Sequence, residues 1–179
     1  MFMPSYTYPK PEADVCYAMM DTRPGTYALI LATTSRALIE VGRRGSLQIH
    51  PGFYVYVGSA HGPGGLRARL AHHLGPSRRP HWHLDYLRPH ITPEEVWYCC
   101  DSIRWECRWA HCIGMQREAS TPMAGFGSSD CNCGSHLFFF EDRPSRAAFA
   151  PALGKVRALV SPSPFAWDCP ARPLMSFRV

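Results

Sequence analysis

Four residues of the chain carry side chains of the kinds that cut phosphodiester bonds. Two are tyrosines, Tyr27 in Gly25-Thr26-Tyr27 and Tyr56 in Tyr56-Val57-Gly58, and Arg69 and Glu106 follow along the chain. A tyrosine hydroxyl can relay a proton, an arginine can neutralise charge on a phosphate, and a carboxylate can anchor a divalent cation. Together these residue types suggest hydrolysis of a phosphodiester bond with one metal ion.

Glu106 lies in a segment, Ser102 to Ile113, whose pattern predicts a helix. At about 100° per residue, Arg104 lies on a polar face of that helix and Glu106 on the opposite, core-facing side. A carboxylate on the core side costs free energy unless it meets a cation, a metal or hydrogen-bond donors. Two roles are therefore open for Glu106: a ligand in a metal or phosphate site, or one half of a buried ion pair with an arginine such as Arg69.

Hydrophobic periodicity predicts the elements that must position these residues. Strands are expected at Gly25–Thr33, Ala37–Val41, Ser46–Ser59 (broken at Pro51-Gly52), Glu95–Cys100 and Ser135–Phe140, and helices at Leu66–Leu74, His81–Leu87, Ser102–Ile113 and Arg146–Leu153. The first three strands have hairpin spacing, which indicates an antiparallel sheet and an α/β (α+β) fold. We expect a single domain over residues 25–154, an irregular N-terminal arm at 1–24 and a proline-rich tail at 155–179.

The composition is that of a globular protein. The chain has 179 residues, of which 46% are hydrophobic and 18% are charged. It contains no apolar stretch near the ~20 residues of a membrane span and no basic region followed by an apolar block at its start. We therefore expect a cytoplasmic protein that does not enter a membrane.

Basic residues are concentrated between His61 and His90. This segment carries five arginines and six histidines against a single acid, Asp85. Such an excess, interleaved with aromatic residues, suits a phosphate backbone, although an ordinary solvated helix and loop would also explain it. The residues expected to bind DNA are Arg67, Arg78, Arg79, His81, Trp82, His83 and Arg88.

The eight cysteines do not suggest a disulfide framework in a chain without a signal sequence. Cys131, Cys133 and His136 could supply three zinc ligands, with Cys99, Cys100, Cys107 or Cys112 as the fourth. A CxC spacing strains a tetrahedral site, however, and cysteines beside apolar residues are commonly buried free thiols. We therefore expect free thiols rather than zinc.

The order of the four candidate residues resembles the GIY-YIG nuclease superfamily over about residues 25–113. The matching motifs are Gly25-Thr26-Tyr27, Tyr56-Val57-Gly58, Leu66-x-x-Arg69 and Glu106. The resemblance implies a small domain with a central three-stranded antiparallel sheet flanked by helices, extended here by a C-terminal strand and helix. It further implies that Tyr27 and Tyr56 lie near the scissile phosphate, that Arg69 contacts it, and that Glu106 binds one Mg²⁺ or Mn²⁺.

Four further stretches are similar to one branch of that superfamily and extend the match to about residue 141. They are Gly52 to Ala60 (GFYVYVGSA), His81 to Leu87 (HWHLDYL), Glu106-Cys107, and Gly125 to Cys131 through Ser135 to Leu137. Members of that branch occur alone or appended to DNA-repair glycosylases resembling endonuclease III, which suggests a role in DNA repair and DNA-repair partners.

The chain departs from the wider superfamily in the 28 residues between Tyr27 and Tyr56, a longer gap than is typical. An inserted strand or loop must extend the hairpin that joins them. Position 59 is a serine, where some members place a lysine or another polar group. These departures leave the proton acceptor open, and His61 or His73 could deprotonate a tyrosine or a water.

We therefore expect a metal-dependent endonuclease that hydrolyses DNA. Whether it also cuts RNA, and how many subunits assemble, stays open. Two alternatives remain: a catalytically silent nucleic-acid-binding module that keeps the basic segment, and an interaction protein stabilised by zinc at Cys131, Cys133 and His136.

Overall fold

A five-stranded antiparallel sheet forms the centre of the computed structural model, which describes residues 21–75, 80, 82–153 and 157–160. Its strand order is β6-β4-β1-β5-β7, with β1 at Gly25–Thr33, β4 at Gly52–Ala60, β5 at Thr92–Cys100, β6 at Leu137–Phe140 and β7 at Arg157–Val160. The first seven residues of β1 are buried, as a continuous apolar run requires, so this strand must be covered on both faces.

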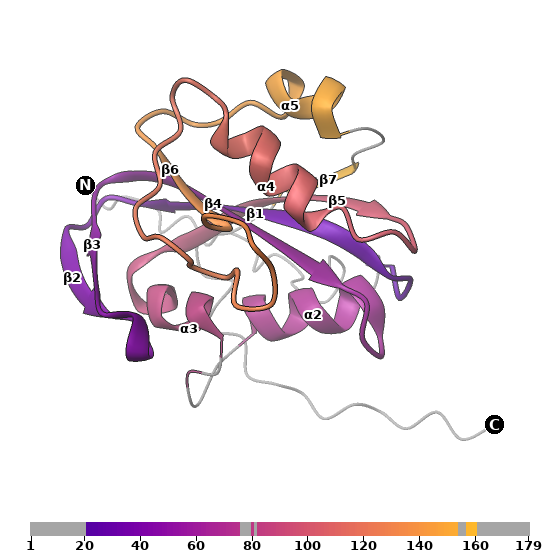
Figure 1. The fold of residues 1–179 in the computed structure, drawn as a ribbon, viewed down its shortest axis with the longest axis horizontal. Helices are drawn as coiled ribbons and strands as arrows, with labels where there is room; N and C mark the ends of the chain where they lie inside the picture. The colour runs from indigo at the N-terminus through magenta and orange to yellow at the C-terminus, as the bar shows by residue number, and fades with distance from the viewer. Residues whose placement is uncertain (1–20, 76–79, 81, 154–156, 161–179) are drawn as a thin grey trace, which may run out of the picture.

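Helices supply that cover, two on each side of the sheet (Figure 1). On one side lie α2 at Gly65–Leu74 and α3 at His83–Leu87, and on the other lie α4 at Glu106–Gly114 and α5 at Arg146–Leu153. Successive side chains of β1 point alternately into two separate hydrophobic cores, one on each face of the sheet. Tyr27, Leu29 and Leu31 pack in the core shared with α2 and α3, and Ala28 and Ile30 in the core shared with α4. The fold is thus the mixed α/β class expected from the sequence.

The second expected strand and the first half of the third do not join the central sheet. β2, Ala37–Glu40, and β3, Ser46–Ile49, form a separate two-stranded sheet around a short 3₁₀ turn, η1, at Gly42–Arg44. The stretch expected as one strand divides at Pro51-Gly52, where Gly52 has a φ of +141° that glycine adopts at little cost. Only β4, the second half, pairs with β1. The β2–β3 hairpin is the insertion that the 28-residue gap predicts.

The helix that carries Glu106 begins four residues later than predicted, because Asp101 organises the turn before it. The Asp101 carboxylate accepts hydrogen bonds from the Ile103 backbone N–H and the Trp105 indole N–H, both at 2.9 Å. Bonding of this kind offers the backbone an alternative to a helical turn. Glu106 therefore lies in the first turn of α4, and the prediction that Arg104 and Glu106 occupy opposite faces of one helix is wrong.

At the C-terminal end, β7 lies inside the segment expected to be a tail and pairs with β5 over Glu95–Tyr98. A second 3₁₀ turn, η2, at Arg88–His90, leads into β5. Most of the expected arm and most of the expected tail lie outside the described residues. Of the helices that the structure describes, none has the length and apolar character needed to cross a bilayer.

Candidate functional site

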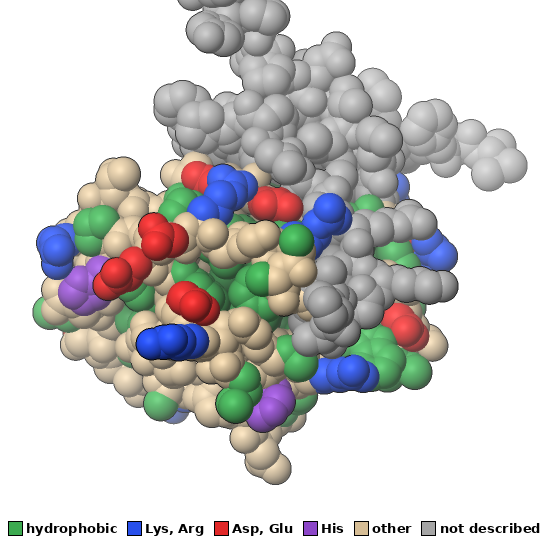
Figure 2. Space-filling view, turned by 90° about the horizontal axis from the view of Figure 1, so that it is seen from above, with side chains coloured by type: hydrophobic (Ala, Val, Ile, Leu, Met, Phe, Trp, Pro, Cys, Tyr) green, Lys and Arg blue, Asp and Glu red, His purple; other side chains and the backbone are tan. Residues whose placement is uncertain are grey.

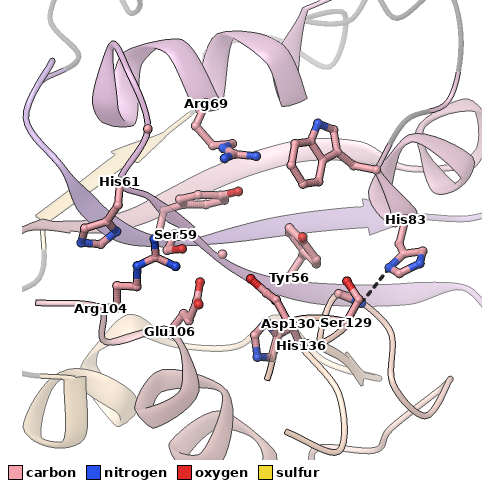
Figure 3. A pocket seen from close by; sticks show the side chains of 15 residues that line it. Tyr56, Ser59, His61, Arg69, His83, Arg104, Glu106, Ser129, Asp130 and His136 are labelled. Carbon is pink, nitrogen blue, oxygen red and sulfur yellow. Dashed lines mark hydrogen bonds between the residues drawn. The ribbon is translucent and has the colours of Figure 1, made fainter. Parts of the chain in front are cut away.

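All four candidate catalytic residues line one pocket of about 590 Å³ beside strand β4. Tyr27 comes from β1, Tyr56 from β4, Arg69 from α2 and Glu106 from α4. Figure 3 shows Arg69 projecting from the helix on one side of the sheet and Glu106 from the helix on the other. The remaining lining residues are Gly58, Ser59, His61, Gly62, Trp82, His83, Arg104, Gly127, Ser129, Asp130 and His136.

The pairing of β1 with β4 fixes the two tyrosines. Tyr27 lies opposite Gly58, and Leu29 lies opposite Tyr56, so the two tyrosines are diagonal neighbours on one face of the sheet. A Cβ at position 58 would lie 2.4 Å from the Tyr27 hydroxyl, so only a glycine lets that ring cross β4. This close contact explains why the residue after Tyr56-Val57 is a glycine.

Tyr56 is covered by a second glycine, from the loop before β6. A Cβ at Gly127 would lie 2.8 Å from Cε2 of Tyr56, and the φ of Gly127 is +74°, a left-handed conformation that side chains disfavour. Burial raises the pKa of both tyrosines above the ordinary value, only partly offset by the Arg69 charge. Both rings are therefore neutral phenols at physiological pH, able to donate a hydrogen bond.

Arg69 is held in place by an aromatic ring. Its guanidinium carbon lies 4.4 Å from the centre of the Trp82 ring, a cation–π contact. Trp82 in turn precedes α3, and its backbone N–H donates to buried Asp85 at 2.9 Å. The start of α3 thus positions Trp82 against Arg69.

Two carboxylates point into the pocket opposite Arg69 (Figure 3). Glu106 is buried, with 9% of its surface exposed, whereas Asp130 on the loop before β6 is exposed. In the described part of the chain, Glu106 and Arg69 do not form an ion pair with each other. The alternative considered from the sequence, in which Glu106 and Arg69 form a buried ion pair that only stabilises the fold, is therefore not observed.

The two candidate proton acceptors have different surroundings. His61 lines the pocket, and neither of its ring nitrogens has a hydrogen-bond partner among the described residues. His73 is 1% exposed and lies behind the tyrosines, with ring centres 5.8 Å from Tyr27 and 5.9 Å from Tyr56. Burial, assisted by His72 and Arg69, lowers the pKa of His73 to about 3, so its ring is neutral. Only His61 faces the space that a substrate would enter.

The residues expected to bind DNA do not share one environment. Trp82 and His83 line the pocket, where His83 Nδ1 accepts from the Gly127 backbone N–H at 3.1 Å, and Arg67 is exposed on α2. Arg88 faces inward instead, 3.6 Å from the Asp85 carboxylate. Arg78, Arg79 and His81 lie outside the described residues. On the opposite side of the sheet, over α4 and α5, the described acidic and basic side chains are intermixed rather than uniformly basic (Figure 2).

Sequence reasoning missed several pocket residues. Arg104 was assigned to a solvent-facing helical surface, yet it lines the pocket together with Glu106. Ser129 and Asp130 carry no periodic signal, because they lie in a Gly/Ser-rich loop whose position depends on tertiary contacts. One clue was present: Asp130 is the only acid in the long Gly/Ser/Cys stretch from Gly125 to His136.

The same loop brings four potential metal ligands together. The ligand atoms of Cys107, Cys131, Cys133 and His136 all lie within 4.8 Å of one another. Cys107 comes from the first turn of α4, beside Glu106, and the other three from the loop. The cluster could hold a metal ion, in contrast to the separate free thiols expected from the sequence.

Comparison with known proteins places the chain by sequence family alone. No curated protein matches it, and no solved structure does. The model of one family, described as domain of unknown function DUF123, matches residues 26–157, which include all four candidate catalytic residues and the cysteine–histidine cluster. That match spans most of the chain, and the protein therefore belongs to the DUF123 family.

Proposed function

We propose that this protein is a metal-dependent endonuclease of the GIY-YIG type that hydrolyses DNA phosphodiester bonds. The observation that carries the proposal is the convergence of Tyr27, Tyr56, Arg69 and Glu106 on one pocket, although they come from four different elements. Glu106 is buried and has no arginine partner among the described residues, and Arg69 stacks on Trp82 across the pocket. These two side chains carry opposite charges and leave room between them in the pocket. A phosphate with a bound cation complements both charges.

In this proposal Arg69 binds the phosphate. Its stacking on Trp82 fixes the guanidinium plane and reduces the conformational freedom lost on binding. Arg104 lies at the opposite side of the pocket, where it can contact a neighbouring phosphate of the same strand. The charge that develops on the phosphate oxygens in the transition state is neutralised by Arg69.

The tyrosines orient the attacking water and relay its proton. As neutral phenols in a buried wall, they can each accept one hydrogen bond and donate another, which is the requirement for a relay. His61, whose ring nitrogens lack a protein partner here, is the residue that can receive the proton.

Glu106 would hold the divalent cation, Mg²⁺ or Mn²⁺, and Asp130 lies where it can add a second carboxylate or bind a water of the ion. When bound, such an ion polarises the phosphate and stabilises the leaving oxygen. Oxygen ligands suit these hard cations, whereas the neighbouring cysteines do not.

The test is a cleavage assay of the purified protein with Mg²⁺ or Mn²⁺ on plasmid, branched and single-stranded DNA, with RNA in parallel. We expect Glu106→Gln to abolish cleavage while DNA affinity and the melting temperature stay near those of the wild type. Glu118→Gln, which changes an exposed glutamate beyond α4, is the matched control and should cut normally. Cleavage by Glu106→Gln at the wild-type rate would refute the proposal. Tight DNA binding without any cleavage by the wild type would favour the silent binding module.

A further inference from the structure

The loop from Gly125 to His136 is well formed although it has almost no hydrophobic anchor. Apart from fully buried Phe126, the segment reads Gly-Ser-Ser-Asp-Cys-Asn-Cys-Gly-Ser and offers no large apolar side chain to a core. Backbone hydrogen bonds close the loop at its ends, from Gly125 N–H to the Gly134 carbonyl (2.6 Å) and from His136 N–H to the Phe126 carbonyl (2.7 Å). Within the loop there are two longer bonds of 3.4 Å, from Ser128 N–H to the Gly125 carbonyl and from Cys131 N–H to the Ser128 carbonyl. Something other than hydrophobic burial must hold the residues between them.

The four clustered ligand atoms lie in the middle of this loop and reach α4. Around a tetrahedral zinc with Zn–S of about 2.3 Å and Zn–N of about 2.0 Å, sulfur atoms lie about 3.8 Å apart, and a sulfur and a nitrogen about 3.5 Å apart. In the structure Cys131 Sγ lies 3.4 Å from His136 Nε2, and all four atoms lie within 4.8 Å of one another. The CxC spacing, which argued against zinc in the sequence, does not keep the two sulfur atoms from reaching a common centre.

We propose that Cys107, Cys131, Cys133 and His136 bind one structural Zn²⁺, which fastens the loop to the first turn of α4. Three thiolates and one imidazole form a closed site that leaves no position for substrate, so the ion acts in stability and not in the chemistry. Cys107 lies in the first turn of α4 and is the one ligand from outside the loop, so the ion would join these two segments.

The site deepens the proposed function, because the zinc would tie together α4 and the loop, which carry the two carboxylates of the pocket. Cys107 is next to Glu106, Cys131 is next to Asp130, and His136 itself lines the pocket. The zinc would therefore fix the distance between the two carboxylates that face the substrate. Zinc binding does not rest on the nuclease proposal; only its effect on cleavage does.

The experiment measures zinc in the full chain, purified without added metal or chelator. We expect one zinc per chain by elemental analysis, released when a mercurial reagent titrates the thiols. Cobalt exchanged into the protein should give the visible bands of a tetrahedral ion and the near-ultraviolet charge transfer of bound thiolates. Cys133→Ser should lose the zinc. Cys112→Ser, a partly buried cysteine of α4 outside the cluster, should keep it.

A second measurement keeps the proposal testable if Cys133→Ser fails to fold. Hydrogen exchange of the wild type, with zinc bound and after its removal, should show lost protection in residues 125–136 and little change in β1. Absence of zinc and of the cobalt spectrum in folded wild-type protein would overturn the proposal, as would a disulfide between cluster cysteines. Zinc with no nuclease activity would leave the site standing and remove the proposed function. Nuclease activity in zinc-free protein with an ordered loop would support the proposed function and overturn the zinc site.

Discussion

The two walls of the pocket are built in opposite ways. The sheet wall, Tyr27, Tyr56 and Gly58, belongs to regular strands, and the pairing of β1 with β4 determines each position. The loop wall, Gly127 to His136, has no repeating hydrogen-bond pattern. Its described anchors are Phe126, a few backbone bonds, the hydrogen bond from Gly127 N–H to His83 and the ligand cluster. The sheet wall is therefore rigid through the core of the fold, whereas the loop wall depends on a small number of local contacts. The two tyrosines therefore lie on the wall that strand pairing fixes, and Asp130 lies on the wall that local contacts fix.

Of the variants that compare the two walls, Arg69→Ala should give the largest effect, because Arg69 lines the pocket between them and, in the proposed nuclease, would serve the reaction rather than the fold. We expect a fall in the single-turnover rate on the order of 10²–10³-fold, as for other groups that stabilise a transition state. The melting temperature should change little, since Arg69 has no described ion pair. Arg67→Ala, on the exposed side of α2, is the control. A large loss of stability with normal cleavage would show that Arg69 is structural.

Asp130→Asn tests the loop wall by its charge alone. We expect the Mn²⁺ concentration for half-maximal cleavage to rise by about 10- to 100-fold, the usual cost of losing a group that supports a metal ligand. Saturating Mn²⁺ should restore much of the rate, because Glu106 remains. Asp142→Asn, an exposed acid beyond β6, should leave the Mn²⁺ dependence unchanged. An unchanged Mn²⁺ dependence in Asp130→Asn would remove this residue from the metal site.

Gly58→Ala tests the sheet wall by its shape. The new methyl group would lie 2.4 Å from the Tyr27 hydroxyl, so the ring must move. We expect a destabilisation of about 1–3 kcal/mol, typical of overpacking, together with a loss of cleavage. Gly62→Ala is the matched control, because Gly62 lines the same pocket and a Cβ there meets no atom within 4 Å. Equal effects of the two changes would show that the Tyr27–Gly58 contact does not matter.

His73 supplies a smaller, pH-dependent test of the sheet wall. Burial holds its pKa at about 3 in the folded protein, against an ordinary value of 6.5. Between these values the unfolded chain binds a proton that the folded chain excludes, so the free energy of unfolding falls as the pH falls below 6.5. The slope reaches at most about 1.4 kcal/mol per pH unit from this residue. Melting curves from pH 7 to pH 4 should show a weaker pH dependence for His73→Gln than for His111→Gln, a change at an exposed histidine. The same pH dependence of the melting temperature in the two variants would contradict the low pKa of His73.

The difference between the walls also explains what could be predicted from the sequence. Gly25–Thr33 and Arg146–Leu153 match β1 and α5 residue for residue, because their apolar patterns specify an element without reference to the rest of the chain. The start of α4 was misplaced, because the side-chain bonds of Asp101 to Ile103 and Trp105 override local helix propensity. β2 and β3 form an antiparallel hairpin as expected, but the separation of this hairpin from β1 was not predicted, since the joining of strands into sheets is decided by tertiary packing.

The residues of the site divide in the same way, into those that local sequence motifs indicate and those that only tertiary contacts bring to the pocket. Tyr27, Tyr56, Arg69 and Glu106 were predicted as site residues from the order of their motifs, and all four line one pocket. Arg104 and Asp130 were not found, because neither position follows from a helical or strand period. The fourth ligand of the cluster was left open among Cys99, Cys100, Cys107 and Cys112, because only the folded chain shows that the loop packs against the first turn of α4.

Because Arg69 and Glu106 come from helices on opposite faces of the sheet, no single layer of the fold contains the pocket. A partly folded chain with the sheet and one helical layer would hold both tyrosines but only one of these two charged residues. During refolding, the capacity to bind a phosphate would therefore return only with the last layer to dock, later than the signal from the strands. In the proposed nuclease, a nascent chain would therefore be unable to cut nucleic acid before its folding is complete.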